Sequence, residues 1–160
     1  TQPPRHLDQQ RVAGRMAVAF TGVAPLRVGM TAREAREALG LPPQTTPTTP
    51  ESCSYLDLKG KPLHAFVMMT SDTIVRFDVR DNTLATEAGA RVGDSEATVV
   101  GLYRGRVRIQ PHKYLPSGHN LVVTTPADSA LRLVFETDGK QVTAYHAGRR
   151  PEVEYVEGCG

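Results

Sequence analysis

The chain has 160 residues, of which 39% are hydrophobic and 22% are charged, and its formal net charge is +2. This composition is ordinary for a soluble globular protein, and a chain of this length can bury roughly 70% of its unfolded surface. The small net charge predicts no general attraction to nucleic acid or to membranes, and no run approaches the roughly 20 apolar residues that span a bilayer. We therefore expect no nucleic-acid partner and no transmembrane segment.

The first residues, 1–16, are polar and contain two prolines close to the start. We expect either a short helix or an extension outside the fold. No signal peptide stands at Thr1, which is what the mature form of an exported chain would show.

A five-residue motif that occurs twice predicts the architecture. Residues 27–31 read Arg-Val-Gly-Met-Thr and residues 91–95 read Arg-Val-Gly-Asp-Ser. Each phrase precedes a helix-like segment, and three strand-like runs follow each helix. Self-similarity at a long period indicates one supersecondary unit used twice. We therefore predict two tandem repeat units, residues 17–82 and residues 83–150.

The first predicted helix begins at Thr31. Its hydroxyl can accept a backbone hydrogen bond from Glu34, whose carboxylate can reach back to Thr31, and this is the capping-box arrangement. The predicted core-facing side chains of this helix are Ala35, Ala38 and Leu39. The second helix begins at Ser95 and lacks the box, and its corresponding side chains are Val99, Leu102 and Tyr103.

Strand-like runs are predicted at residues 52–58, 63–70 and 73–79, and again at residues 120–125, 130–136 and 141–147. Apolar and polar residues alternate in most of them, which indicates an antiparallel sheet covered on one side only. In the last run, the sequence does not decide which side chains face the core. One set is Val142, Ala144 and His146, and the other is Thr143 and Tyr145. We predict an α+β fold in which both units share one curved sheet with helices on one face.

The connection after the second helix, residues 104–119, carries four formal positive charges and no acidic residue. Guanidinium and imidazole groups beside an aromatic ring can recognise an anionic or sugar-bearing partner. The candidate binding residues are Arg106, Arg108, His112, Lys113, Tyr114 and His119. The alternative is a solvated edge strand whose charges prevent pairing between sheets.

Three histidines raise the question of a metal site, because a catalytic zinc usually has three protein ligands. His112, His119 and His146 show no short ligand spacing, so we interpret them as structural or surface residues and predict no metal and no cofactor. The chain contains no Gly-x-Ser-x-Gly elbow, phosphate-binding loop or His-Glu-x-x-His motif. We therefore expect a protein that is not an enzyme.

Two cysteines, Cys53 and Cys159, lie at the start of the first strand and at the penultimate position. A disulfide between them would tie the tail back across nearly the whole fold and would indicate an oxidising compartment. The alternative is two unrelated free thiols. The tail itself, residues 151–160, alternates acidic and apolar residues and is a candidate edge strand.

The pattern Gly-Met-Thr-x-x-Glu-Ala followed by Leu-Gly, used twice before antiparallel strands, resembles the β-lactamase-inhibitor-protein-like fold. The small outer-membrane assembly lipoproteins of the SmpA/OmlA kind are similar in a single copy. The residues that carry the resemblance are Gly29, Met30, Thr31, Glu34, Ala35, Leu39, Gly40, Val92, Gly93, Ser95 and Val99. The resemblance implies tandem helix-plus-sheet units in exported bacterial proteins that bind other proteins. Because this chain has no Trp and only two Cys, no inhibitory contact residue is carried over by position.

These observations predict a periplasmic or extracellular bacterial protein, with anchoring through a removed N-terminal segment left open. We expect it to bind another macromolecule, a protein first of all, through its exposed sheet face and loops. The alternative is a binder of a small ligand or of an anionic envelope polysaccharide that uses residues 104–119. A structural subunit of an envelope complex is a third interpretation.

Overall fold

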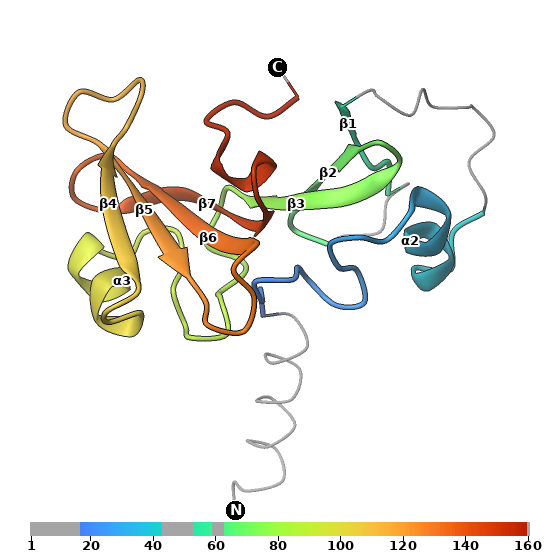
Figure 1. Ribbon diagram of the computed structural model, residues 1–160, viewed down its shortest axis with the longest axis horizontal. Coiled ribbons are helices and arrows are strands. Elements are labelled where there is room, and N and C mark those ends of the chain that lie inside the picture. The colour runs from blue at the N-terminus through green and yellow to red at the C-terminus, as the bar shows by residue number, and fades with distance from the viewer. Residues whose placement is uncertain (1–16, 43–52, 59–62, 160) are drawn as a thin grey trace, which may run out of the picture.

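The computed structural model describes residues 17–42, 53–58 and 63–159, so the short helix or extension expected over residues 1–16 lies outside the described residues. The described residues form one antiparallel sheet with two α-helices and one 3₁₀ helix (Figure 1). The strands are β1 (Cys53–Tyr55), β2 (Phe66–Thr70), β3 (Thr73–Val79), β4 (Val107–Pro111), β5 (His119–Thr124), β6 (Leu131–Thr137) and β7 (Val142–Arg149). The helices are α2 (Ala32–Ala38), α3 (Glu96–Leu102) and the 3₁₀ helix η1 (Glu152–Glu154). The prediction of an α+β fold with an antiparallel sheet is confirmed.

The order of strands shows how two series join into one sheet. Neighbouring strands follow the order β1-β2-β3-β7-β6-β5-β4. The first series consists of β1 to β3 and the second of β4 to β7, and within each series consecutive strands are antiparallel neighbours. The last strands of the two series, β3 and β7, pair antiparallel in the middle of the sheet. Strand β4 precedes β5 in the sequence and pairs with the edge of β5 that faces away from β6. The connection after α3 therefore forms one free edge of the sheet, and β1 forms the other.

Both helices begin at the predicted caps. The Thr31 hydroxyl accepts a hydrogen bond from the backbone N–H of Glu34 at 3.1 Å, and the Glu34 carboxylate accepts one from the backbone N–H of Thr31 at 3.1 Å. The Ser95 hydroxyl accepts a bond from the backbone N–H of Thr98 at 3.1 Å. These caps satisfy N–H groups that have no partner inside a helix.

The residues just before each helix hold the last strand of their own series in the same way. The backbone N–H of Gly29 donates to the carbonyl of Ile74 in β3 at 2.8 Å, and that of Gly93 donates to the carbonyl of Val142 in β7 at 2.8 Å. In both places the N–H of the same strand residue returns a bond of 2.8 Å to the residue after the glycine. The phrase that repeats in the sequence thus makes the same contacts with β3 and with β7.

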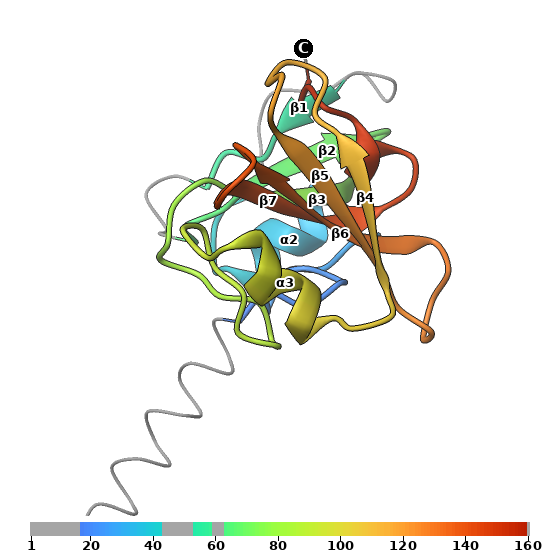
Figure 2. The same cartoon turned by 90° about the vertical axis from the view of Figure 1, so that its left-hand side faces the viewer.

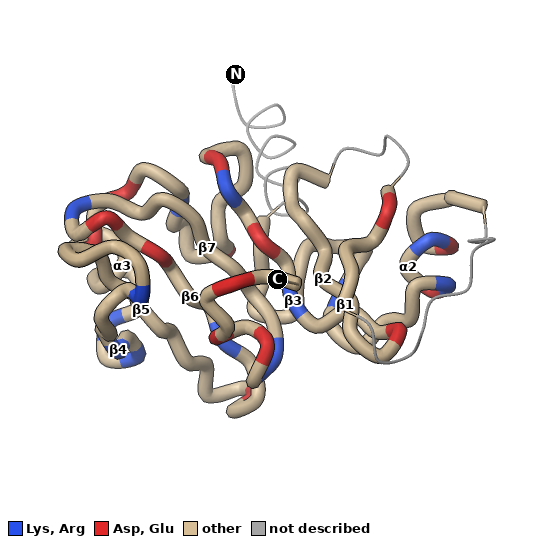
Figure 3. Tube along the Cα trace, turned by 90° about the horizontal axis from the view of Figure 1, so that it is seen from above, with Lys and Arg blue, Asp and Glu red and all other residues tan. Residues whose placement is uncertain are grey.

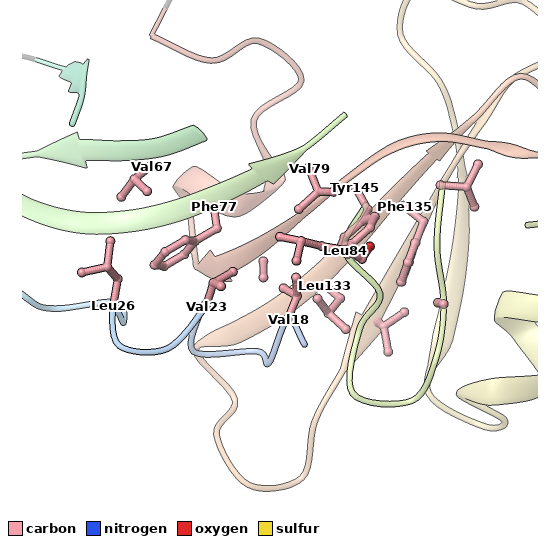
Figure 4. Packing of buried hydrophobic residues seen from close by; sticks show 14 of the residues in the cluster. Val18, Val23, Leu26, Val67, Phe77, Val79, Leu84, Leu133, Phe135 and Tyr145 are labelled. Atoms are coloured by element: carbon pink, nitrogen blue, oxygen red, sulfur yellow. Dashed lines mark hydrogen bonds between the residues drawn. The ribbon is translucent and has the colours of Figure 1, made fainter. Parts of the chain in front are cut away.

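The main hydrophobic core lies on the sheet face that carries both helices, which we call the inner face. Phe77 of β3 and Tyr145 of β7 are fully buried there, and Leu26 of the segment before α2 packs in the same cluster (Figure 4). The two helices contribute Ala35 and Val99 to this cluster. Both helices therefore cover the same face of the shared sheet.

A register shift in the β6–β7 pair decides which side chains of β7 face the core. Thr137 pairs with Val142, whereas the residue before Thr137 pairs with Ala144, so β7 has one extra residue between them. Val142 and Tyr145 consequently both belong to the inner core. His146 pairs with Val134, which lies outside that core, and therefore faces the opposite, outer face. A bulge of this kind breaks the alternation from which faces are predicted.

Residues 151–159 cross the outer face of the sheet, so the prediction that one face is open to solvent is wrong at the centre of the sheet (Figures 1 and 3). Val153 in η1 is fully buried and packs with Val122 and Val134 of the outer face. This segment, which we call the C-terminal strap, contains a 3₁₀ helix and no strand among its described residues, where we expected a candidate edge strand. Its alternation of acidic and apolar residues serves to bury one valine and to leave the acids beside the sheet.

A disulfide joins Cys53 in β1 to Cys159 at the end of the strap, as predicted. The Cα atoms lie 5.3 Å apart and the sequence separation is 106. The backbone N–H of Cys159 also donates to the Tyr55 hydroxyl at 3.4 Å. The strap is therefore fastened to the edge strand β1 at its far end.

Candidate functional site

The basic segment that we predicted as a binding site forms an exposed edge of the sheet. Strand β4 has β5 on one side only (Figure 2), and four of its five residues are exposed. Arg104, Arg106 and Arg108 make no ion pair with any residue that the structure describes. We call β4 together with Arg104, Arg106, Arg108 and Lys113 the basic edge, and its charges stand along β4 in Figure 3.

The main chain of β4 has hydrogen-bonding groups on its free side. The carbonyl of Arg106 accepts a bond from the N–H of Thr124 at 3.1 Å, and the N–H of His112 donates to the carbonyl of Gly118 at 3.0 Å. In an antiparallel pair, successive residues alternate between bonding toward the partner strand and pointing away from it. Positions 108 and 110 therefore bond toward β5, and the N–H and C=O of Ile109 point away from β5.

The side chains of β4 alternate between the two faces of the sheet. Arg108 pairs with Val122, which belongs to the outer-face cluster, so Arg108 lies on the outer face. Ile109 pairs with Leu121 of the inner core and is nevertheless 54% exposed, because β4 is the last strand on this side.

Arg106 lies close to α3. Its guanidinium carbon is 5.6 Å from the centroid of the Tyr103 ring, a distance at which the cation is attracted to the ring face. The Tyr103 side chain is buried, and burial raises the pKa of its hydroxyl, which donates to the Thr86 hydroxyl at 2.7 Å. A buried and hydrogen-bonded ring thus orients the Arg106 guanidinium at the basic edge.

The His112 side chain lies beneath the loop after β4, residues 112–118, and holds its backbone. Its side chain is 6% exposed. The Nδ1 atom accepts hydrogen bonds from the backbone N–H groups of Tyr114 and Leu115 at 3.1 and 3.2 Å, which places a proton on Nε2. Nε2 then donates to Glu136 Oε1 at 2.9 Å. His112, which we predicted as a contact residue, is therefore a residue that positions the loop.

Lys113 and Tyr114 are the exposed members of this loop. The Tyr114 side chain is 54% exposed, and the Lys113 ammonium lies 5.2 Å from the centroid of its ring. The same ammonium is 4.0 Å from the Glu157 carboxylate of the strap, and both side chains are largely exposed. Since exposed pairs contribute little free energy, Lys113 remains available to another anion.

His119 lies beside the first turn of α3. Its Nδ1 atom is 2.7 Å from the Glu96 carboxylate, which also accepts a hydrogen bond from the Thr137 hydroxyl. Burial on its own would raise the pKa of Glu96, but the hydrogen bonds from Thr137 and His119 outweigh it and lower that pKa. This contact connects β5 to α3, so the His119 side chain supports the fold and is turned toward α3 at the point where the loop joins β5.

The structure thus separates the predicted binding residues by position. Those at the exposed edge and its loop are Arg106, Arg108, Lys113 and Tyr114. His112 lies beneath the loop, and His119 faces α3. Glu136 is approached by His112 and, on its other oxygen, by His146, whereas His119 lies with Glu96. Among residues 17–42, 53–58 and 63–159, no group of three or more His, Cys, Asp or Glu side chains could hold a metal ion.

A buried ionic cluster beneath the strap was not predicted. Arg76 and Asp78 occupy alternate positions of β3, and their side chains are 4% and 6% exposed. The Arg76 Nε donates to Asp78 Oδ1 at 2.7 Å, and the His146 Nδ1 lies 3.5 Å from the same oxygen. The alternating charges of β3 were visible in the sequence, but such a pattern indicates a face open to solvent.

Burial controls the titration of this cluster. It raises the pKa of Asp78, and the nearby Arg76 opposes that rise only in part. Burial, followed by the charge of Arg76, holds the pKa of His146 well below its ordinary value. His146 is therefore neutral at pH 7, and Arg76 supplies the positive charge of the cluster.

The cluster also holds the strap on the sheet. Arg76 donates to the backbone carbonyls of Glu152 at 3.0 Å and Tyr155 at 2.6 Å. Arg132 of β6 lies 3.8 Å from the Glu154 carboxylate. These contacts close the centre of the outer face to a partner and leave its edges free.

A hollow of about 380 Å³ lies at the other end of the sheet, beside β1 and β2. Tyr55 and Phe66 line it and are 39% and 50% exposed. The Arg80 guanidinium carbon lies 4.7 Å from the centroid of the Phe66 ring. Apolar and aromatic side chains share the lining of this hollow with Asp57, His64, Arg80 and Asp81, and the hollow is separate from the basic edge.

None of the helices described in this chain is long and apolar enough to cross a membrane. No protein-family model matches the chain, and no curated protein matches it. Among solved structures, the chain is similar to the uncharacterized protein yfeY from Escherichia coli. The sequence identity is 14%, the match covers 83% of this chain and 99% of that chain, and the TM-score is 0.50. A likeness at this identity shows the fold alone.

Proposed function

We propose that this chain is a non-catalytic binding protein that contacts another protein through the basic edge and the loop after β4. The observation that carries the proposal is that Arg104, Arg106 and Arg108 have no acidic partner among the described residues, while Ile109 and Tyr114 are each 54% exposed. Arginine and aromatic side chains that gather on a surface are typical of protein interfaces. Because the strap covers the centre of the outer face, we assign the contact to the edge and its loop.

We propose further that the protein works in the periplasm or outside a bacterial cell. The disulfide between Cys53 and Cys159 supports this location, because such bonds persist mainly in oxidising compartments. An anchor on a segment removed from the chain would place the same fold at a membrane surface. Release of the native protein by osmotic shock, with its thiols already oxidised, tests the location.

We infer that the two halves, residues 17–82 and 83–150, are copies of one unit, as in the β-lactamase-inhibitor-protein-like fold. The matching bonds of Gly29 to β3 and of Gly93 to β7 support the inference, as do the hydroxyl caps of α2 and α3. A crystal structure in which the two units superimpose, helix on helix and strand on strand, tests it.

An anionic envelope polysaccharide is the alternative partner of the same residues. The exposed Tyr114 ring with the Lys113 ammonium 5.2 Å away favours it, because an aromatic face can stack on a sugar while a cation meets an acidic group. Binding to an array of acidic glycans, lost on Tyr114→Ala, would support this alternative. An obligate partner that copurifies in equal amount would instead indicate a structural subunit.

Capture from a bacterial envelope extract tests the main proposal. The bait is the full chain, compared with the variant Arg106→Glu/Arg108→Glu. The matched control is Arg27→Glu/Arg33→Glu, which makes the same change in net charge at exposed positions next to and within α2. We expect a captured protein that the control retains and the basic-edge variant loses. Equal capture by both variants, or no enriched protein with the native chain, would remove the proposal.

A further inference from the structure

We propose that β4 receives an extended, acidic segment of the partner protein as an additional strand of the sheet. The inference rests on the proposed function and names the chemistry of the partner. Addition of a strand uses main-chain hydrogen bonds for affinity and alternate side chains for specificity. The basic edge offers main-chain groups and alternating side chains for both purposes.

The main chain of β4 is suited to strand addition around its centre. The bonds of Arg106 and His112 to β5 fix the alternation, so the N–H and C=O of Ile109 point toward the free side. Pro111 has no N–H and ends the available ladder at that end of β4. The opposite edge of the sheet is less suitable, because β1 has only three residues and carries the disulfide.

The side chains of β4 define what the added strand must carry. Ile109 lies on the inner face with half of its surface exposed, so the residue beside it gains by being apolar. Arg108 lies on the outer face without an acidic partner among the described residues, so the residue beside it gains by being acidic. The preferred segment therefore alternates Asp or Glu with Val, Ile or another apolar residue.

Charge argues against a second copy of this chain as the occupant. Pairing β4 with its own copy would bring two sets of Arg106 and Arg108 to the same edge, and like charges on adjacent strands are destabilising. The acidic and apolar residues of the chain's own strap are engaged elsewhere, because Val153 is fully buried and Arg76 holds the carbonyl of Tyr155. We therefore assign the segment that fits β4 to another protein.

A synthetic peptide tests the proposal on the intact, oxidised protein. The probe is a capped heptapeptide, Glu-Val-Glu-Val-Glu-Val-Glu, and the readouts are fluorescence anisotropy and amide hydrogen exchange followed by NMR. We expect the exchange of the Ile109 amide to slow at least tenfold when the peptide is bound. We expect Arg108→Glu to weaken binding at least tenfold, and Arg33→Glu, with the same change in charge, to leave it within twofold.

Peptide backbone variants separate strand addition from simple attraction between charges. One peptide is N-methylated at the valines and another at the glutamates, so that only one of them keeps the N–H groups that face β4. We expect one of the two to lose at least tenfold in affinity and the other to bind within threefold of the parent. Ile109→Pro, which removes an N–H that points away from β5, should also weaken binding at least tenfold.

The outcomes distinguish this inference from the proposed function. Failure of the parent peptide to bind at millimolar concentration, or binding that leaves the Ile109 amide unprotected, would overturn strand addition. If a protein is still captured through Arg106 and Arg108 in that case, the proposed function stands without strand addition. If the peptide binds as expected but the envelope extract yields no captured protein, strand addition stands as a property of β4 and the proposed function fails.

Discussion

The guanidinium group of Arg76 donates a hydrogen bond of 2.6 Å to the backbone carbonyl of Tyr155, 79 positions further along the chain. The same group forms a buried ion pair with Asp78 on the outer face of the sheet, beneath the strap. One buried cation therefore serves both the ion pair of β3 and the strap that covers it. This double role makes the closed outer face depend on Arg76.

We expect Arg76→Met to lower the free energy of unfolding by about 3–5 kcal/mol, because it leaves the Asp78 carboxylate buried without its partner. The strap carbonyls of Glu152 and Tyr155 lose their donor at the same time. The measurement is urea-induced unfolding. The double variant Arg76→Met/Asp78→Leu should be more stable than the single one, since it removes both buried charges.

The matched control for this prediction is Arg150→Met. Arg150 pairs with Glu154 at 3.4 Å, but its side chain is 52% exposed, so we expect a loss within about 1 kcal/mol. A loss of that small size for Arg76→Met as well would show that the buried pair does not hold the strap.

The features that were predicted correctly from the sequence are those set by neighbouring residues. The cap at Thr31 needs only Glu34 three positions later, and both contacts are present. The predicted helix faces were right in part: Ala35, Val99 and Tyr103 belong to the core and Leu39 packs against it, whereas Ala38 and Leu102 are exposed. Each helix has only seven residues and turns little more than Ala35 or Val99 into the core.

The features that could not be predicted depend on contacts distant in the sequence. Arg76 and Asp78 alternate with apolar residues in the way of a solvent-exposed face, and nothing local shows that Val153 will cover that face. At the basic edge, charge and aromatic content predicted a candidate binding segment. Its sequence could not show that His112 lies under the loop, because that position is decided by Glu136 on β6.

Reduction of the disulfide is expected to destabilise the protein strongly. The bond between Cys53 and Cys159 has a sequence separation of 106, and closing a loop of about 100 residues is worth up to about 4.7 kcal/mol in the chain-entropy account. We expect dithiothreitol to lower the urea midpoint of the native protein. Cys53→Ser/Cys159→Ser should unfold at that lower midpoint with or without reductant. A double variant as stable as the oxidised native protein would contradict this expectation.

His146 should make stability fall on mild acidification. Burial and Arg76 keep its folded-state pKa well below 6.5, so below about pH 6.5 the unfolded chain binds a proton that the folded chain does not. Stability is then lost as the pH falls from 6.5 toward the folded-state pKa, by about 1.4 kcal/mol per pH unit at most. The raised pKa of Asp78 acts in the opposite direction as the pH falls through it.

The variant His146→Gln isolates the effect of this histidine. We expect the difference in unfolding free energy between the native protein and the variant to shrink as the pH falls from 7.5 to 5.5, measured by urea unfolding in steps of half a pH unit. A difference that stays constant over this range would show that His146 titrates alike in the folded and unfolded chains.

Two glycine-to-alanine changes should shift stability in opposite directions. Gly148 of β7 pairs with Arg76, and an added Cβ would collide with the carbonyl oxygen of Val75 and lie 2.8 Å from the Cα of Arg76. Since neither backbone atom can move without opening the β3–β7 pair, we expect Gly148→Ala to cost about 1–3 kcal/mol or more. Gly101 lies exposed in α3 with nothing within 4 Å of an added Cβ, so Gly101→Ala should gain about 1 kcal/mol. Calorimetric melting of both variants checks the pair. A Gly148→Ala protein that melts as high as the native one would mean that β3 and β7 approach less closely, and that the strap and the ionic cluster rest on a looser sheet.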